Sequence, residues 1–391
     1  MTINNEHKKL NVPNLRFPEF QGEWEKCTLS EVCKFHNGRA YKQSELLAAG
    51  KYRILRVGNF FTNDSWYYSN LELEDNKYAQ DGDLLYAWSA SFGPRFWKEE
   101  KVIYHYHIWK IDSFKNVDKE FMYHFLDLDS SKIKNEVQGG TMVHITKGNM
   151  EKRAISYPSI NEQKKIAKLL SLLDERISTQ NKIIDKLQSL IKGLNQRVFT
   201  NSGINYKLGE ICEISSGYSG RQLLSKKGLK VSRIETISGH KVNMERVGYV
   251  APFESSENYR LRVGDILFSN INSVEYIGNT AFIDKDYDLY HGMNLLRLTP
   301  NNMVVIPFYL YLLLNTNTML NRFKTVCNKA VSQASINQTE LGKTVVQIPL
   351  INTQKQICEL YQALYDKLES EKYANSLFQK QKQYLLRQMF I

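Results

Sequence analysis

The 391-residue sequence has few cysteines, few prolines and no long apolar run. Its five cysteines form no CxxC pair, which argues against a disulfide framework and a zinc site, and we expect a protein of the reducing cytoplasm. The longest apolar run, residues 303–314, contains Pro307 and is too short to cross a membrane. We therefore expect no membrane partner.

Several catalytic motifs are also missing. An adenine amino-methyltransferase holds its flipped base with an Asn/Asp-Pro-Pro-aromatic loop, but the eight prolines of this chain are never adjacent. Residues 342–344 read Gly-Lys-Thr, yet Asn337 stands where a phosphate-binding loop needs its first glycine. The chain has no HExxH zinc motif, and structural roles are expected for the histidines in aromatic or strand contexts, which are His105, His107, His144 and His291. We expect no catalytic residue, no metal and no cofactor in this chain.

The composition is that of a globular protein with two or three domains, with 42% hydrophobic and 12% aromatic residues. The net charge is +11 and the pI is about 9.1, which favours an anionic partner. A solvated, lysine-rich surface explains the charge equally well. Charge alone does not decide between them.

The strongest pattern is an internal repeat. Residues 157–199 recur as residues 348–390, and Pro158 and Gln163 match Pro349 and Gln354. Each copy has a heptad seam, which predicts two long helices that pack in a coiled coil. The first seam comprises Ile166, Leu170, Leu173, Ile177, Gln180, Ile184, Leu187, Ile191, Leu194 and Val198. The second, more polar seam comprises Ile357, Tyr361, Leu364, Leu368, Glu371, Asn375, Phe378, Lys382, Leu385 and Met389.

The regions before the two helices also match each other. LSEVCKFHNGR at residues 29–39 corresponds to LGEICEISSGY at 208–218, Arg56 to Arg233, and GDLLY at 82–86 to GDILF at 264–268. Alternating runs at 101–111 and 276–283 predict strands, with His105 and His107 on one strand face, and 121–126 and 308–314 predict helices. The expected fold class is α+β, with a pseudo-two-fold repeat of two similar mixed domains. We expect domain 1 at 1–157, a long helix at 158–200, domain 2 at 201–348 and a second long helix at 349–391.

Four features of the sequence point to a known family, which are the LRFPEF…W arm at residues 15–24, the GD[LI]L[YF] strands, the P-x-[IL]-x-x-Q-x-x-I start of each helix and the order of the segments. With these features, the sequence resembles the specificity subunit of a type I restriction-modification system. The resemblance implies two target-recognition domains that each read half of a split site in double-stranded DNA, separated by an antiparallel coiled coil. It also implies methyltransferase subunits docked on the helices and restriction (motor-nuclease) subunits in the assembly. S-adenosylmethionine and ATP would then bind those partners, and this chain would not be an enzyme.

If the helices are antiparallel and level, the residue numbers of facing seam positions add up to 555. Gln180 then faces Asn375, and Ile184 faces Glu371. A buried amide layer of this kind selects one register of a coiled coil.

DNA contacts are expected from basic and polar residues in the loops of both domains. The first-domain candidates are Arg53, Arg56, Asn59, Ser89, Ser91, Arg95, Lys98, Thr141, His144 and Lys147. The second-domain candidates are Arg221, Lys226, Lys227, Arg233, Asn270, Asn272, Ser273, Asn294, Ser332, Gln333, Ser335 and Asn337. Loops 87–95 and 269–273 are favoured, followed by 139–147 and 330–337, while each single residue could equally be a solvated side chain or a turn former.

Two other functions fit the same repeat. A stand-alone DNA-binding regulator could use duplicated readers, and a coiled-coil adaptor could use the helices without DNA. The adaptor leaves the paired polar loops without a role, and a regulator is more often a small dimeric module.

Overall fold

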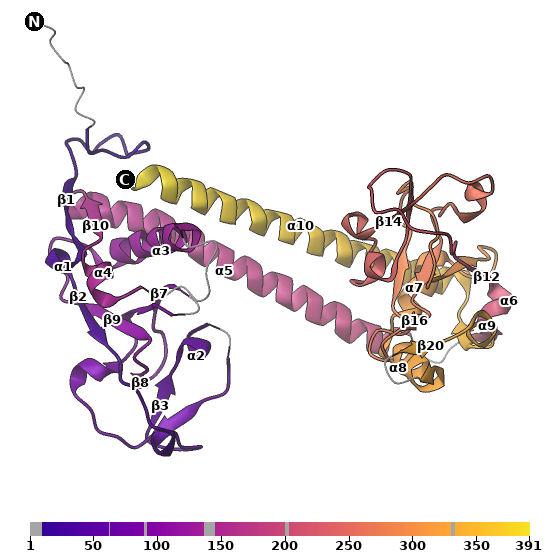
Figure 1. The fold of residues 1–391 in the computed structure, drawn as a ribbon, viewed down its shortest axis with the longest axis horizontal. Helices are drawn as coiled ribbons and strands as arrows, with labels where there is room; N and C mark the ends of the chain where they lie inside the picture. Colours follow the sequence, from indigo (N-terminus) through magenta and orange to yellow (C-terminus); the bar gives the residue numbers. More distant parts are fainter. Residues whose placement is uncertain (1–9, 62, 90–91, 137–144, 200–202, 330–332) are drawn as a thin grey trace, which may run out of the picture. The chain divides into compact units, whose positions relative to one another are not determined.

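The computed structural model describes residues 10–61, 63–89, 92–136, 145–199, 203–329 and 333–391. The chain divides into two compact units, one formed by Met1–Asn181 and Tyr373–Ile391 and the other by Lys182–Lys372. Each unit holds one globular domain and one half of each of two long helices, α5 (Ile160–Arg197) and α10 (Ile351–Met389), as Figure 1 shows. The predicted division into two domains and two separate helices stays a prediction. The two compact units each combine a domain with the half-helices that pack against it.

Within the described residues, the first unit has two four-stranded sheets, ordered β2-β9-β6-β7 and β4-β3-β8-β5, and a strand pair β1-β10. Neighbouring strands are antiparallel except β3 and β8. The strands are β1 (Glu25–Thr28), β2 (Lys34–Asn37), β3 (Tyr52–Leu55), β4 (Tyr67–Ser69), β5 (Tyr78–Ala79), β6 (Leu84–Ala87), β7 (Gly93–Phe96), β8 (Val102–Tyr104), β9 (Ile108–Asp112) and β10 (Ala154–Tyr157). The helices are α1 (Leu29–Val32), α2 (Val57–Phe61), α3 (Lys119–Glu136) and α4 (Lys147–Glu151), with short 3-10 helices η1 (Gln43–Glu45) and η2 (Asp75–Lys77).

The described part of the second unit has antiparallel sheets ordered β12-β18-β15-β17 and β16-β20-β19, and the pairs β11-β21 and β13-β14. Its strands are β11 (Ile204–Lys207), β12 (Cys212–Ser216), β13 (Leu229–Val231), β14 (Gly248–Val250), β15 (Ile266–Phe268), β16 (Ile271–Asn272), β17 (Thr280–Phe282), β18 (Leu296–Pro300), β19 (Asn328–Lys329), β20 (Ala334–Ser335) and β21 (Val345–Ile348). Its helices are α6 (Leu208–Ile211), α7 (Pro307–Leu314), α8 (Asn317–Val326) and α9 (Gln338–Gly342), with η3 (Ile234–Ile237), η4 (Met244–Arg246) and η5 (Ser256–Tyr259).

The matched Gly-Asp pairs form the same turn in both domains. Gly82 and Gly264 have φ angles of +83° and +99°, a backbone conformation that favours glycine. The carboxylate of Asp83 accepts a hydrogen bond from the Gln80 amide, and that of Asp265 accepts one from the Arg262 amide, both at 2.8 Å. The motif therefore recurs because the turn before β6 and β15 needs both residue types.

Two matched glutamines tie the start of each long helix to its domain. The Gln163 amide group donates to the carbonyls of Asn116 and Pro158, at 2.9 and 2.8 Å, and accepts from the Asp118 amide at 2.7 Å. Gln354 makes the equivalent three bonds, to the Val304 and Pro349 carbonyls and from the Ile306 amide. Both side chains are fully buried, so each satisfies backbone groups that water cannot reach.

The arm at residues 15–24 packs on the first unit. The Arg16 guanidinium makes two bonds of 2.7 Å to the carboxylate of Glu162, which is 1% exposed. Trp24 is buried against Phe121 of α3, with ring centroids 6.1 Å apart, and the Leu15 amide donates to the Gln388 carbonyl at 2.9 Å. The arm thus contacts the beginning of α5, helix α3 and the end of α10.

The two long helices pack antiparallel within both units. In the first unit, Ile166 and Leu170 near the start of α5 share a core with Met389 and Phe390 at the end of α10. In the second unit, the other half of α5 packs against the first half of α10, through Ile184, Leu187, Ile191, Leu194, Ile357, Tyr361, Leu364 and Leu368. With the duplicated domains, this confirms the predicted fold class.

The register of the helix pair agrees with the predicted one to within a residue. The Arg176 guanidinium lies 5.3 Å from the Phe378 ring centroid, and the Asn375 side chain donates to that of Asn181 at 2.9 Å. The numbers in these pairs add up to within one of 555. Gln180, the expected partner of Asn375, is buried and precedes Asn181 in the chain, and the predicted pairing of Gln180 with Asn375 stays a prediction.

Two predicted strands are wrong in part. Residues 101–111 form β8 and β9 with a turn at 105–107 between them, so His105 and His107 do not lie on one strand face. In 276–283, β17 covers Thr280–Phe282 and the first residues form a turn. The turn at 105–107 has no glycine or proline, so the sequence gives no local signal for it. The predicted helices at 121–126 and 308–314 are confirmed as α3 and α7.

Candidate nucleic-acid interface

Two predicted arginines of the first domain lie over aromatic rings. The Arg53 guanidinium is 4.6 Å from the Trp66 ring centroid, and that of Arg56 is 4.3 Å from the Tyr67 ring centroid. Arg53 also lies 2.9 Å from the carboxylate of Glu99 and 3.0 Å from that of Glu100, and these two carboxylates offset its charge. Stacking holds both guanidinium planes in defined positions, which suits recognition of phosphate or base edges.

Arg95 and Asn59 belong to the same region. Arg95 on β7 donates to the carbonyl of Phe60 in α2, and its guanidinium is 5.8 Å from the Phe60 ring. Asn59 uses its amide to donate to the carbonyls of Asn63 and Ser65, at 2.9 and 2.7 Å. The fold thus brings Arg56, Asn59 and Arg95 together around α2, and Asn59 supports the loop itself. Arg53 is linked to this region through Trp66, which packs against the hydrophobic cluster that includes Phe60.

The other first-domain candidates are more scattered. Ser89 is buried, Lys98 is exposed, and the Lys147 ammonium lies 3.5 Å from the Glu151 carboxylate on the same helix. The remaining three, Ser91, Thr141 and His144, lie outside the described residues.

In the second domain, two predicted loops form one surface. Ile271 pairs with Ser335 in the β16-β20 ladder, and the Ile336 amide donates to the Asn270 carbonyl at 2.9 Å. Asn272 donates to the Ser269 hydroxyl at 3.1 Å. The polar side chains of 269–273 and 333–337 therefore lie side by side, which the sequence could not show because the two segments are distant along the chain.

Some second-domain candidates have local roles. Asn337 caps α9, since its side chain accepts from the Glu340 amide at 2.8 Å. Asn294 has a φ of +64°, as a turn former would. Arg233 is exposed and lies 3.5 Å from Glu235. Also exposed are Arg221, Lys226, Lys227, Ser273 and Gln333, whereas Ser332 lies outside the described residues.

An aromatic cluster that the sequence did not predict lies at the turn of residues 105–107. The Tyr106 ring lies 3.9 Å from that of His107 and 6.0 Å from that of Trp88 between centroids. Trp88 donates its indole N–H to the Tyr106 carbonyl at 2.8 Å, which joins the turn to the favoured loop at 87–95. Burial, assisted by the nearby His107 and Arg56, lowers the pKa of His105 to about 4, so the cluster is neutral at this residue near pH 7.

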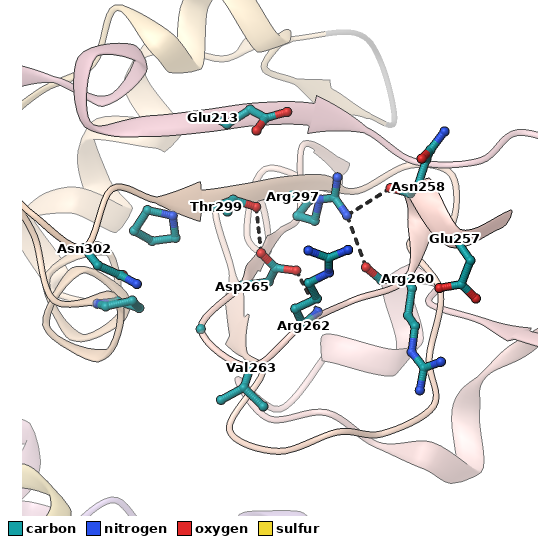
Figure 2. A pocket seen from close by; sticks show the side chains of 13 residues that line it. Glu213, Glu257, Asn258, Arg260, Arg262, Val263, Asp265, Arg297, Thr299 and Asn302 are labelled. Carbon is teal, nitrogen blue, oxygen red and sulfur yellow. Dashed lines mark hydrogen bonds between the residues drawn. The ribbon is translucent and has the colours of Figure 1, made fainter. Parts of the chain in front are cut away.

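A pocket of about 500 Å³ lies at the other end of β15, beside the Gly264–Asp265 turn. Figure 2 shows the guanidinium groups of Arg262 and Arg297 near each other, whereas the Arg260 side chain points away from them. Arg297 donates to the carbonyls of Asn258 and Arg260 at 3.2 and 3.3 Å. The pocket is also lined by the carboxylates of Glu213, Glu257 and Asp265, which balance the three arginine charges. It has no net charge to attract an anion, so the loops above remain the better candidate interface.

Within the described residues, no helix is long and apolar enough to cross a membrane. The same part of the chain has no cluster of three or more His, Cys, Asp or Glu side chains that could hold a metal ion.

The two domains have the same arrangement of elements but different side chains on their matched loops. With the antiparallel helix pair, they define a protein with duplicated recognition domains. The sequence family described as the type I restriction modification DNA specificity domain matches residues 21–189 and again residues 204–376. The chain belongs to this family, and the resemblance seen in the sequence is confirmed.

Relatives support this assignment along the chain. The MjaX specificity subunit of Methanocaldococcus jannaschii is 42% identical over 158 residues, which are 39% of this chain and 37% of that relative. The type I restriction enzyme EcoBI specificity subunit of Escherichia coli is 21% identical, over 96% of this chain and 87% of that relative. The solved S subunit from M. genitalium has a TM-score of 0.62 and 18% identity, covering 97% of this chain and 99% of that chain.

Proposed function

We propose that this chain is the DNA-reading subunit of a type I restriction-modification complex, and that each domain reads one half of a bipartite site. The observation that carries the proposal is a shared backbone frame with different side chains. Counted from the matched Gly-Asp pairs, Trp88 and Ser89 follow β6 in the first domain, whereas Asn270 and Ile271 stand at the same positions after β15 in the second. Two copies of one scaffold with different contact residues suit two different half-sites.

The chain has no catalytic role in this proposal. Methyl transfer belongs to methyltransferase subunits that bind S-adenosylmethionine and dock on the long helices, and DNA cleavage belongs to restriction subunits that use ATP. The sequence supports this division because it lacks the base-holding loop of an adenine methyltransferase and a complete phosphate-binding loop.

The test is a domain exchange. Residues 203–347 are replaced by the equivalent segment of another family member, and the sites methylated by the complex with a methyltransferase subunit are sequenced. One half of the site should change while the other half stays the same. Exchange of residues 25–157 is the reciprocal control and should change the opposite half. Changes in both halves from a single exchange would contradict the proposal.

A second measurement separates the alternatives. The purified chain is assayed for methylation with S-adenosylmethionine, with and without the methyltransferase subunit. Activity of the chain alone would overturn the non-catalytic role. Tight sequence-specific binding without any methyltransferase would favour a stand-alone regulator, and an absence of DNA binding in every combination would favour an adaptor.

A further inference from the structure

We propose that Tyr106 and Met293, at the tips of two equivalent turns, are specificity-determining residues that make apolar contacts with base pairs, each in its own half-site. The inference rests on the proposed function and names contact residues within it. Tyr106 was not among the polar and basic candidates predicted from the sequence, and neither was Met293.

The two turns occupy equivalent places in the domains. His105 forms an isolated parallel bridge with Arg39, and Gly292 forms the same bridge with Tyr218. The Arg39 amide donates to the Tyr104 carbonyl at 3.1 Å, and the Tyr218 amide donates to the His291 carbonyl at 2.9 Å. Each acceptor stands two residues before the tip of its turn. In both domains the turn connects directly to the strand that lies second in the four-stranded sheet, β9 or β18.

A glycine in each domain lets this turn pack closely. A Cβ atom on Gly38 would lie 2.3 Å from the His105 carbonyl oxygen, and one on Gly217 would lie 1.9 Å from the Gly292 carbonyl oxygen. Neither position can hold a larger residue without moving the turn. The match between Gly38 and Gly217 in the sequence is therefore explained by the turn.

Each tip presents an apolar side chain to solvent on this fixed backbone. Tyr106 is 40% exposed and Met293 is 37% exposed. The Tyr106 ring is supported by the rings of His105 and His107, at centroid distances of 4.4 and 3.9 Å. A side chain held in place before binding loses little conformational entropy on contact, which favours its use in recognition.

The neighbours of the tips are the residues expected to contact DNA. The His105 amide donates to the Leu55 carbonyl at 2.9 Å, next to Arg56, and the Gly292 amide donates to the Ser232 hydroxyl at 3.0 Å, next to Arg233. Arg56 and Arg233 are the pair matched between the two halves of the sequence. Each tip thus lies close to a matched arginine that could hold a phosphate, while the tip itself reaches toward the groove.

The chemistry of the two tips differs as two half-sites require. Apolar side chains discriminate bases through the thymine methyl group or by wedging at a base step. Tyrosine adds a rigid ring and a hydroxyl that can bond to a base edge, whereas methionine is flexible and adapts to the surface it meets. Exchanging the two residue types should therefore change which bases are preferred, and in one half-site at a time.

The experiment uses the full chain with its methyltransferase subunit and a library of sites randomised in both halves. The variants are Tyr106→Met, Tyr106→Ala, Met293→Tyr and Met293→Ala. We expect each to lower modification of the native site about tenfold or more and to change base preference in one half only. Met303→Ala, at an 86% exposed position beyond the opposite end of β18, is the control and should change neither.

The outcomes separate this inference from the proposed function. Native preference in both halves and modification within about twofold of wild type in all four variants would overturn the role of the tips while leaving the domains as readers. A change in both halves from a single substitution would also overturn it. Modification without sequence preference by the wild-type complex would overturn the proposed function, and this inference with it.

Discussion

The ammonium of Lys382 in α10 lies 2.7 Å from the carboxylate of Asp174 in α5. It also lies 2.9 Å from the carboxylate of Asp127 in α3, so one lysine joins three helices of the first unit. Burial lowers the pKa of Lys382, but the two carboxylates outweigh it and keep the pKa above its ordinary value. A lysine in a heptad seam, which weakens an apolar coiled coil, is here stabilised by its partners.

Lys382→Met should lower the free energy of unfolding of the first unit by about 1–3 kcal/mol. The substitution leaves two carboxylates close together without their cation, and they are about a third exposed, which moderates the cost. Urea unfolding measures the change, with Lys380→Met on the exposed side of the same helix as a control within about 0.5 kcal/mol. Equal effects of the two substitutions would show that the three-helix ion cluster does not stabilise the unit.

The matched glutamines should be needed equally in the two units. Gln163→Leu and Gln354→Leu each leave three backbone groups without a partner, and each should cost about 2–4 kcal/mol in its own unit. Hydrogen exchange by mass spectrometry should show faster exchange in residues 116–118 for the first variant and in 304–306 for the second. Gln188→Leu, at an exposed position of α5, should leave both segments unchanged. Slower or unaltered exchange in the two core variants would contradict the role assigned to these amides.

The close glycines should affect one half-site each. Gly38→Ala and Gly217→Ala place a Cβ atom against the turn carbonyl, so the turn must shift, and base preference should weaken in the half-site of that domain. Gly193→Ala is the matched control, since its Cβ would meet nothing within 4 Å on α5 and should stabilise the helix by about 0.5–1 kcal/mol. Site preference is measured by sequencing methylated DNA, and thermal unfolding checks that the variants are folded. Retained preference in Gly38→Ala and Gly217→Ala would argue against a fixed turn.

Acid should destabilise the second domain through His291. The Nε2–H group of this fully buried ring donates to the Leu295 carbonyl at 2.9 Å, and burial lowers the pKa of His291 to about 4. Because the folded pKa is lower than the unfolded value of about 6.5, the neutral ring's contribution is complete above pH 6.5 and is lost as the pH falls toward 4, by about 1.4 kcal/mol per pH unit.

The measurement for His291 is unfolding free energy between pH 7.5 and pH 4.5, for wild type and His291→Gln. The variant should be less stable at neutral pH because it loses a fitted core residue. Its stability should then fall less steeply than that of the wild type on acidification. Parallel curves for the two proteins would show that His291 does not titrate in this range.

The sequence alone determined the features that depend on residues close along the chain. The heptad seams predicted two long helices, since a 3.5-residue apolar period suits helix pairing and no strand. The Gly82–Asp83 and Gly264–Asp265 turns, Gln163 and Gln354 were visible as repeats, because each has the same local task in both halves. The family assignment followed from the order of these repeated parts.

Tertiary structure decided what depends on contacts between distant residues. Only packing shows that residues 105–107 form a turn, because the turn packs closely against Gly38. The local sequence has no glycine or proline that would indicate it. Likewise, only strand pairing places Ile271 beside Ser335, and only helix packing gives Lys382 its partner Asp127. A buried charge such as that of Lys382 loses its hydration, and this cost is offset only by opposite charges that lie close to it in space. The spacing of residues along the chain does not show which residues these will be.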